Sequence, residues 1–215
     1  MARFTEVARA GQEALATRRR TAGKAADRAV EKKDQIALLP IGIIPGEILG
    51  LLREVLPKTF ERELEVLRPI AVPKQAFNPT RGQYHSSTIL KLIQRTLAGR
   101  FERILAVTDV DLFVPQLNFV FGEADVLNGN AVISLARLRP QFYGLAGDGH
   151  AVRDRVVKEA NHEIGHTYNL SHCENPQCVM FFSNTIRDTD TKFAEFCKEC
   201  AKMLEEHMQT AAKMA

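Results

Sequence analysis

The apolar residues of this chain alternate between two kinds of pattern from residue 36 onward. Short runs of apolar residues predict buried strands, and stretches with apolar positions three and four residues apart predict helices. The predicted strands are residues 36–43, 63–72, 103–111, 117–125 and 130–138, and the predicted helices are 47–60, 88–99, 151–170 and 192–214. Residues 74–87 contain the turn signals Asn-Pro and Arg-Gly and predict a loop.

The order of these elements indicates the fold class. Strand, helix, strand, helix and strand come first, followed by two strands separated by Asn128-Gly129, a hairpin turn signal. We therefore expect an α/β (α+β) fold with a mixed, twisted sheet, an antiparallel edge strand and packed helices. One face of the closing helix is expected to carry Phe193, Phe196, Cys197, Cys200, Leu204 and Met208.

The composition agrees with a folded domain. Of 215 residues, 45% are hydrophobic and 26% charged, so the chain can bury a substantial core without disulfides. No apolar run approaches the roughly 18 residues that a membrane span needs, and the N-terminus lacks an apolar signal-peptide region. We expect a soluble, cytoplasmic protein without a membrane partner. No feature indicates a particular oligomer, and a monomer is expected.

The basic charge of the chain is concentrated near its N-terminus. Residues 1–35 carry nine Lys and Arg against five Asp and Glu, whereas the remainder carries 20 against 21. The neutral remainder argues against a nucleic-acid partner, because phosphate contacts need clustered Lys and Arg. Residues 1–35 are therefore expected to form a separate basic tail. It could be solvated, act as an arm for nucleic acid or an acidic partner, or cover the body.

The most informative segment for function is His162-Glu163-Ile164-Gly165-His166. Two His residues four positions apart lie on one helix face, so both imidazoles can hold one Zn²⁺. Glu163 can reach a water on that metal, which brings the pKa of the water toward about 7. The alternative is an ordinary helix with a surface pair of His. Composition alone produces this pattern with a probability on the order of one in a hundred.

The residues that follow favour the metal site. His172 lies six residues beyond His166, too far around a continuing helix to share its face. Asn169 stands between them, and Asn adopts the left-handed backbone that ends helices more readily than most non-glycine residues. A helix that ends there would deliver His172 as a third ligand. Three protein ligands and a water form the pattern of catalytic zinc sites.

The four Cys fall into two pairs with chelating spacing: Cys173 with Cys178, and Cys197 with Cys200. Four thiolates suit a tetrahedral structural Zn²⁺, so a second zinc ion per chain is expected near the first. One alternative is two disulfides, although nothing marks the chain as secreted. The other is four buried free thiols.

Taken together, these motifs resemble the metzincin metallopeptidases, and among them the archaemetzincins. The resemblance rests on HEIGHTYNLSH, on the Cys pairs and on Cys178-Val179-Met180, and it spans residues 36–205. It implies a metzincin-like fold with a sheet subdomain, residues 36–170, that ends in the active-site helix, and a C-terminal subdomain, residues 171–215. The implied roles are zinc ligands for His162, His166 and His172, general base for Glu163, and a methionine turn beneath the zinc at Met180.

One position departs from the family pattern. The family usually has Gly where this chain has Asn169. Because Asn is the next best residue for a left-handed backbone, the turn is expected to survive.

The sequence therefore predicts a zinc-dependent metallopeptidase whose substrate is a peptide or protein. Strand 117–125 resembles the metzincin edge strand that pairs with an extended substrate; the alternative is an ordinary sheet edge. Residues 181–184 could wall a side-chain pocket. Tyr143, His150 and Tyr168 are candidates in name only for oxyanion stabilisation.

Two other classes of function are open to this sequence. The first is a zinc-bound metzincin-fold protein that binds peptides or a partner with little or no hydrolysis. The retained Glu163 disfavours it, because a pure binder has no use for a base beside the metal. The second is a zinc-ribbon-like nucleic-acid module, which the neutral body and the three His disfavour.

Overall fold

The computed structural model describes residues 32–214, and the expectations for residues 1–31 lie outside the described residues. The strands and α-helices in chain order are β1 (Lys32–Ile41), α2 (Gly46–Phe60), β2 (Glu63–Val66), β3 (Phe77–Asn78), β4 (Gln83–His85), α3 (Ser86–Leu97), β5 (Phe101–Thr108), β6 (Leu112–Phe113), β7 (Gly122–Asp125), β8 (Asn130–Ser134), α4 (Gly149–Thr167), α5 (Ile186–Thr191) and α6 (Lys198–Met214). Short 3-10 turns are η1 (Lys74–Ala76), η2 (Ala136–Leu138) and η3 (Pro140–Tyr143).

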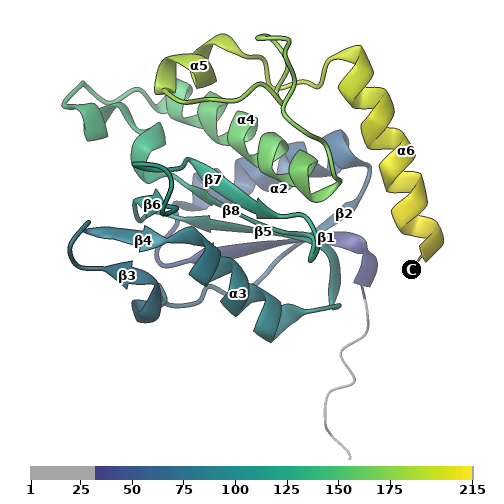
Figure 1. Cartoon of the computed structure of the whole chain (residues 1–215), viewed down its shortest axis with the longest axis horizontal. Helices are drawn as coiled ribbons and strands as arrows, with labels where there is room; N and C mark the ends of the chain where they lie inside the picture. Colours follow the sequence, from purple (N-terminus) through teal and green to yellow (C-terminus); the bar gives the residue numbers. More distant parts are fainter. Residues whose placement is uncertain (1–31, 215) are drawn as a thin grey trace, which may run out of the picture. The chain divides into compact units, whose positions relative to one another are not determined.

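A five-stranded sheet in the order β2-β1-β5-β8-β7 forms the centre of this part of the chain (Figure 1). Strands β2, β1, β5 and β8 are parallel, and β7 at the edge is antiparallel to β8. Gly129, with a φ of 66°, lies in the turn between these two strands. The predicted mixed sheet with an antiparallel edge is confirmed.

Helices cover both faces of the sheet. Successive side chains of a strand point to opposite faces, and in the central strands both sets are apolar. Ile36 and Leu38 of β1 belong to the core shared with α2 and α4, whereas Ala37 and Leu39 belong to the core shared with α3. In Figure 1, α2 and α4 accordingly lie on one side of the sheet and α3 on the other. Helix α4 is thereby held against the sheet beside its edge strand.

The first differences from the sequence prediction concern strands. Strand β1 begins at Lys32, four residues before the predicted Ile36, and Lys32 pairs with Phe101. The predicted loop 74–87 contains η1, β3 and β4, and the two strands form a small second sheet with β6. Of the predicted strand 117–125, only Gly122–Asp125 is strand. Backbone pairing decides these short strands, partly with a neighbouring strand, as for β3 with β4, and partly with a distant one, as for β4 with β6. No local apolar period marks strands of two or three residues.

The closing helix also differs from its prediction. It begins at Lys198, so Phe193, Phe196 and Cys197 precede it instead of sharing its face. The N–H of Phe193 donates to Gln177 O at 2.9 Å. The N–H of Val179 donates to Glu195 O, also at 2.9 Å. These bonds hold the chain beside the segment that carries Met180 and replace helical pairing there.

Within residues 32–214, no helix combines the length and the apolar character that crossing a membrane requires. The predicted division into subdomains at residue 170 stays a prediction.

Helix α4 ends in a left-handed turn that reverses the chain. Asn169 has a φ of 65°, its N–H donates to His166 O at 2.8 Å, and the N–H of Leu170 donates to Gly165 O at 3.2 Å. This pair of bonds is the Schellman arrangement, which usually has Gly at the left-handed position. Asn169 therefore does what the sequence predicts: it ends the helix and turns the chain toward His172.

The turn gives a testable prediction. Replacing Asn169 by Ala should lower the free energy of unfolding by about 1 kcal/mol, because a Cβ disfavours the left-handed backbone. Asn169→Gly should be at least as stable as the wild type. Urea denaturation of the zinc-loaded proteins measures both changes, and equal stability of the Ala and Gly variants would contradict this account of the turn.

Candidate metal centre and active site

Three histidines meet at the C-terminal end of α4. His162 and His166 lie on the helix, and His172 returns to them after the turn at Asn169. Their ring nitrogens lie within 4.8 Å of one another. The structure thus brings together the three predicted ligands.

Backbone carbonyls fix the orientation of two of these rings. Nδ1 of His162 lies 2.8 Å from Val179 O, and Nδ1 of His166 lies 2.7 Å from Leu170 O. A carbonyl only accepts, so each Nδ1 carries the proton and each Nε2 has a free lone pair. The two Nε2 atoms are 3.1 Å apart. Two facing lone pairs repel each other unless a cation lies between them, so the donor set fits a metal ion such as Zn²⁺.

The surroundings keep these imidazoles neutral, which is the form that binds metal. Burial lowers the pKa of His162 well below its usual range, and the positive charge of Lys192 acts in the same direction. Burial also lowers the pKa of His166 and of His172.

Met180 packs directly beneath the helix that carries the histidines. It is fully buried, and a Cβ added at Gly165 would lie 2.6 Å from its Sδ. Its carbonyl accepts a bond from the N–H of Cys173 at 3.0 Å. Gly165 therefore lets the methionine segment approach the helix closely, next to His166.

The four cysteines also converge, and all four are free thiols. Their Sγ atoms lie within 4.8 Å of one another, with Cys173 and Cys197 separated by 3.8 Å. A tetrahedron with Zn–S bonds of about 2.3 Å has sulfur atoms about 3.8 Å apart. The N–H of Cys197 donates to Sγ of Cys178 at 3.3 Å, and burial raises the pKa of Cys200. The cluster fits a zinc ion in place of the four thiol protons.

The side chain of Glu163 extends from α4 toward the edge strand β7. It is 5% exposed, and burial, followed by the negative charge of Glu159, raises its pKa well above the usual range. A Cβ at Gly122 of β7 would approach Cγ and Oε1 of Glu163 to 2.6 Å. The missing side chain of Gly122 thus creates the space that Glu163 occupies.

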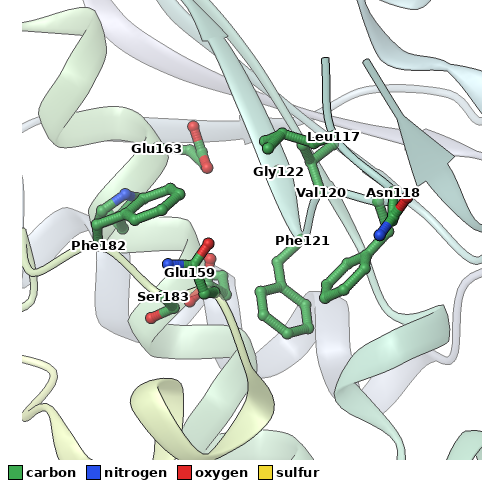
Figure 2. Close-up of a pocket in the computed structure, with 12 residues that line it drawn as sticks. Leu117, Asn118, Val120, Phe121, Gly122, Glu159, Glu163, Phe182 and Ser183 are labelled. Atoms are coloured by element: carbon green, nitrogen blue, oxygen red, sulfur yellow. The ribbon is translucent and has the colours of Figure 1, made fainter. Parts of the chain in front are cut away.

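A pocket of about 180 Å³ opens beside Glu163 and His162. Figure 2 shows Glu163 and Phe182 facing the segment from Leu117 to Gly122 across it. Ser183 and Asn184 also line it, as the sequence predicts, whereas Phe181 does not.

A buried ion pair at this pocket is not among the features that the sequence predicts. Lys192 is fully buried, and its Nζ lies 3.1 Å from Oε1 of Glu159, which is 3% exposed and lines the pocket. A buried charge needs such a partner, because its desolvation is costly. The only local signal is that Glu159 precedes Glu163 by one helical turn.

The three residues considered for oxyanion stabilisation are engaged elsewhere or exposed. The hydroxyl of Tyr168 donates to Oε1 of Glu102 at 2.9 Å, and that of Tyr143 donates to Arg137 O at 3.1 Å. His150 is exposed in the first turn of α4. None of the three lines the pocket beside Glu163.

Known proteins resemble this chain over most of its length. The profile of Peptidase family M54 matches residues 64–206. The archaemetzincin of Methanocaldococcus jannaschii is 45% identical over 172 residues, which cover 80% of this chain and 93% of that protein.

Solved structures give the same result. The archaemetzincin of Methanopyrus kandleri has a TM-score of 0.72 at 33% identity, covering 86% of this chain and 99% of that one. A zinc-dependent peptidase from Methanocorpusculum labreanum has a TM-score of 0.71 at 32% identity, covering 79% and 99%. These matches confirm the metzincin-like fold. The chain belongs to Peptidase family M54, with the archaemetzincins, and is a zinc-dependent metallopeptidase that acts on peptides or proteins.

Proposed function

We propose that peptide bonds are hydrolysed in the cleft between β7 and α4, with His162, His166 and His172 as the ligands of a catalytic zinc ion. The observation that carries this proposal is the pair of Nε2 atoms 3.1 Å apart, each left with a free lone pair by a backbone carbonyl at Nδ1. Such an arrangement is stable with a cation between the rings and strained without one.

In this proposal Glu163 is the general base. Bound Zn²⁺ supplies Lewis-acid chemistry, polarising the scissile carbonyl and making a water more acidic. Glu163 takes a proton from the attacking water as the water oxygen bonds to the carbonyl carbon. Glu163 then gives it to the leaving amine as the C–N bond breaks.

The substrate is proposed to lie along the edge strand. Strand β7 pairs with β8 and ends the five-stranded sheet, so its other edge can pair with an extended peptide. A side chain next to the scissile bond would enter the pocket beside Glu163. Phe119, Phe121 and Phe182 give this pocket apolar walls.

The second metal in this proposal is a structural zinc ion held by Cys173, Cys178, Cys197 and Cys200, which makes two zinc ions per chain. It would tie the start of α6 to the segment that carries His172 and Met180. Four free thiols at metal-binding distance suit a reducing compartment, which supports the cytoplasmic location. The monomeric state stays a prediction.

The first experiment counts zinc. The untagged protein should contain two zinc ions per chain by inductively coupled plasma mass spectrometry. His166→Ala and the double variant Cys197→Ser/Cys200→Ser should each lose one. A cysteine variant that keeps both ions would refute the structural site, and a histidine variant that keeps both would refute the catalytic site.

The second experiment tests the base. Cleavage of a mixed peptide library should fall roughly 100- to 10,000-fold in Glu163→Ala at equal zinc content, because proton transfer is lost. Glu54→Gln, which changes a surface carboxylate on α2, is the matched control. Undiminished cleavage by Glu163→Ala would refute the role of this residue. Peptide binding without cleavage by the wild type would favour the binding-protein alternative.

The third experiment tests the space at Gly122. A Cβ there would displace the Glu163 side chain, so Gly122→Ala should lower kcat roughly 100-fold while zinc content is unchanged. Gly50→Ala is the matched control, since nothing lies within 4 Å of its added Cβ. If Gly122→Ala keeps wild-type kcat, the position of Glu163 does not depend on this close approach.

A further inference from the structure

A group of exposed apolar side chains lies in and just after the 3-10 turn η3, on the segment between β8 and α4. Phe142 is 45% exposed, Tyr143 40% and Leu145 64%. Exposed apolar side chains that gather in one place mark interaction sites more often than scattered ones do. Their position relative to the cleft indicates what they bind.

Arg137 connects this group to the wall of the pocket beside Glu163. Its guanidinium lies 4.1 Å from the ring centre of Phe119, which lines that pocket, and 4.5 Å from the ring centre of Phe142. Arg137 is itself fixed by two bonds to Asp111, at 2.6 and 2.8 Å. We call the surface of Phe119, Arg137, Phe142, Tyr143 and Leu145 the aromatic ledge.

The same polar network holds the rim of the pocket. Gln83 Nε2 donates to Oδ2 of Asp111 at 2.9 Å and to Asn118 O at 3.0 Å. Arg81 donates to Leu117 O and Asn118 O, at 2.9 Å each. The pocket rim around Asn118 and the aromatic ledge are therefore both linked to one carboxylate, that of Asp111.

The ledge has the properties of a binding surface for apolar side chains. The Tyr143 hydroxyl donates to Arg137 O at 3.1 Å, which ties the exposed turn to the residue that contacts Phe119. Binding to such a fixed surface costs little ordering entropy. Asp111 neutralises the charge of Arg137, so the ledge is suited to an uncharged partner. Because the ledge continues the pocket wall through Phe119, a chain that fills the pocket can reach it.

We propose that the aromatic ledge is a second subsite of the substrate cleft, which binds an apolar side chain of the polypeptide a few residues away from the one in the pocket. This inference rests on the proposed function, since it requires the peptide to lie in the cleft beside Glu163. The peptidase would then prefer substrates with two apolar side chains at a fixed spacing.

The test measures binding apart from cleavage. The protein is the zinc-loaded Glu163→Gln variant, and fluorescence anisotropy measures the Kd of fluorescein-labelled decapeptides. Each peptide carries one Phe for the pocket, and its other residues are Ser and Ala. A single Leu is placed two, three or four residues from the Phe, on either side, and an all-Ser version serves as reference. Phe142→Ala is compared with Leu127→Ala, a control at a 96% exposed position in the β7–β8 turn.

One Leu position should bind about 3- to 10-fold more tightly than the Ser reference, and Phe142→Ala should remove that advantage while Leu127→Ala keeps it. No Leu advantage at any position, or an advantage that survives Phe142→Ala, overturns the ledge. An equal loss for the Leu and Ser peptides also overturns it, because that indicates a structural effect. Self-association of the parent protein that Phe142→Ala abolishes would assign the surface to a second copy of the chain instead.

Failure of the proposed function gives a different result. The protein with intact Glu163 could bind the Leu peptide more tightly than the Ser peptide and yet cleave neither. That result would refute hydrolysis in this cleft but would still support the subsite. Cleavage of both peptides with no difference in binding would support hydrolysis in this cleft and refute the subsite.

Discussion

Two imidazole nitrogens held 3.1 Å apart with their lone pairs facing each other are the constraint on which the C-terminal half of this protein depends. The carbonyls of Val179 and Leu170 impose this arrangement by accepting from Nδ1 of His162 and His166. Both carbonyls lie outside α4, one just past the left-handed turn at Asn169 and one beside Met180. The helix supplies the two rings, and the returning chain decides where they point.

The four-cysteine cluster bears on the same constraint. Cys178 directly precedes Val179, whose carbonyl orients His162, and Cys173 directly follows His172. A metal ion bound by the cysteines would restrain both neighbours at once, and backbone bonds already tie Cys173 to Met180. The two candidate metal sites are thus linked through adjacent residues. Such restraint from neighbouring residues orients metal ligands, and here it adds to the packing of Val179 and Met180 in the apolar core.

The other half of the cleft is built from buried or half-buried charges. Lys192 and Glu159 form an ion pair within the protein, and Glu163 lies one turn further along α4. On the opposite side of the cleft, the Asp111 carboxylate accepts hydrogen bonds from Gln83 and Arg137. Gln83 also donates to Asn118 O and so positions the segment around Asn118. Removing water from such groups is costly unless each has a partner. The partners found here hold charged side chains in place on both sides of the space between Glu163 and Gly122.

The sequence by itself determined the order of the main strands and helices, the antiparallel edge and the groups of possible metal ligands. Those features depend on local spacing: apolar periods set strands and helices, and His or Cys residues a few positions apart can chelate one ion. The tertiary structure alone decided the place of Gly122 against Glu163, the Lys192–Glu159 pair and the small second sheet. It also decided the late start of α6. Each of these joins segments distant in the chain, as Arg81 and Leu117 are joined across 36 residues. Such contacts leave no periodic trace in the sequence, because their energy depends on the packing of the folded chain.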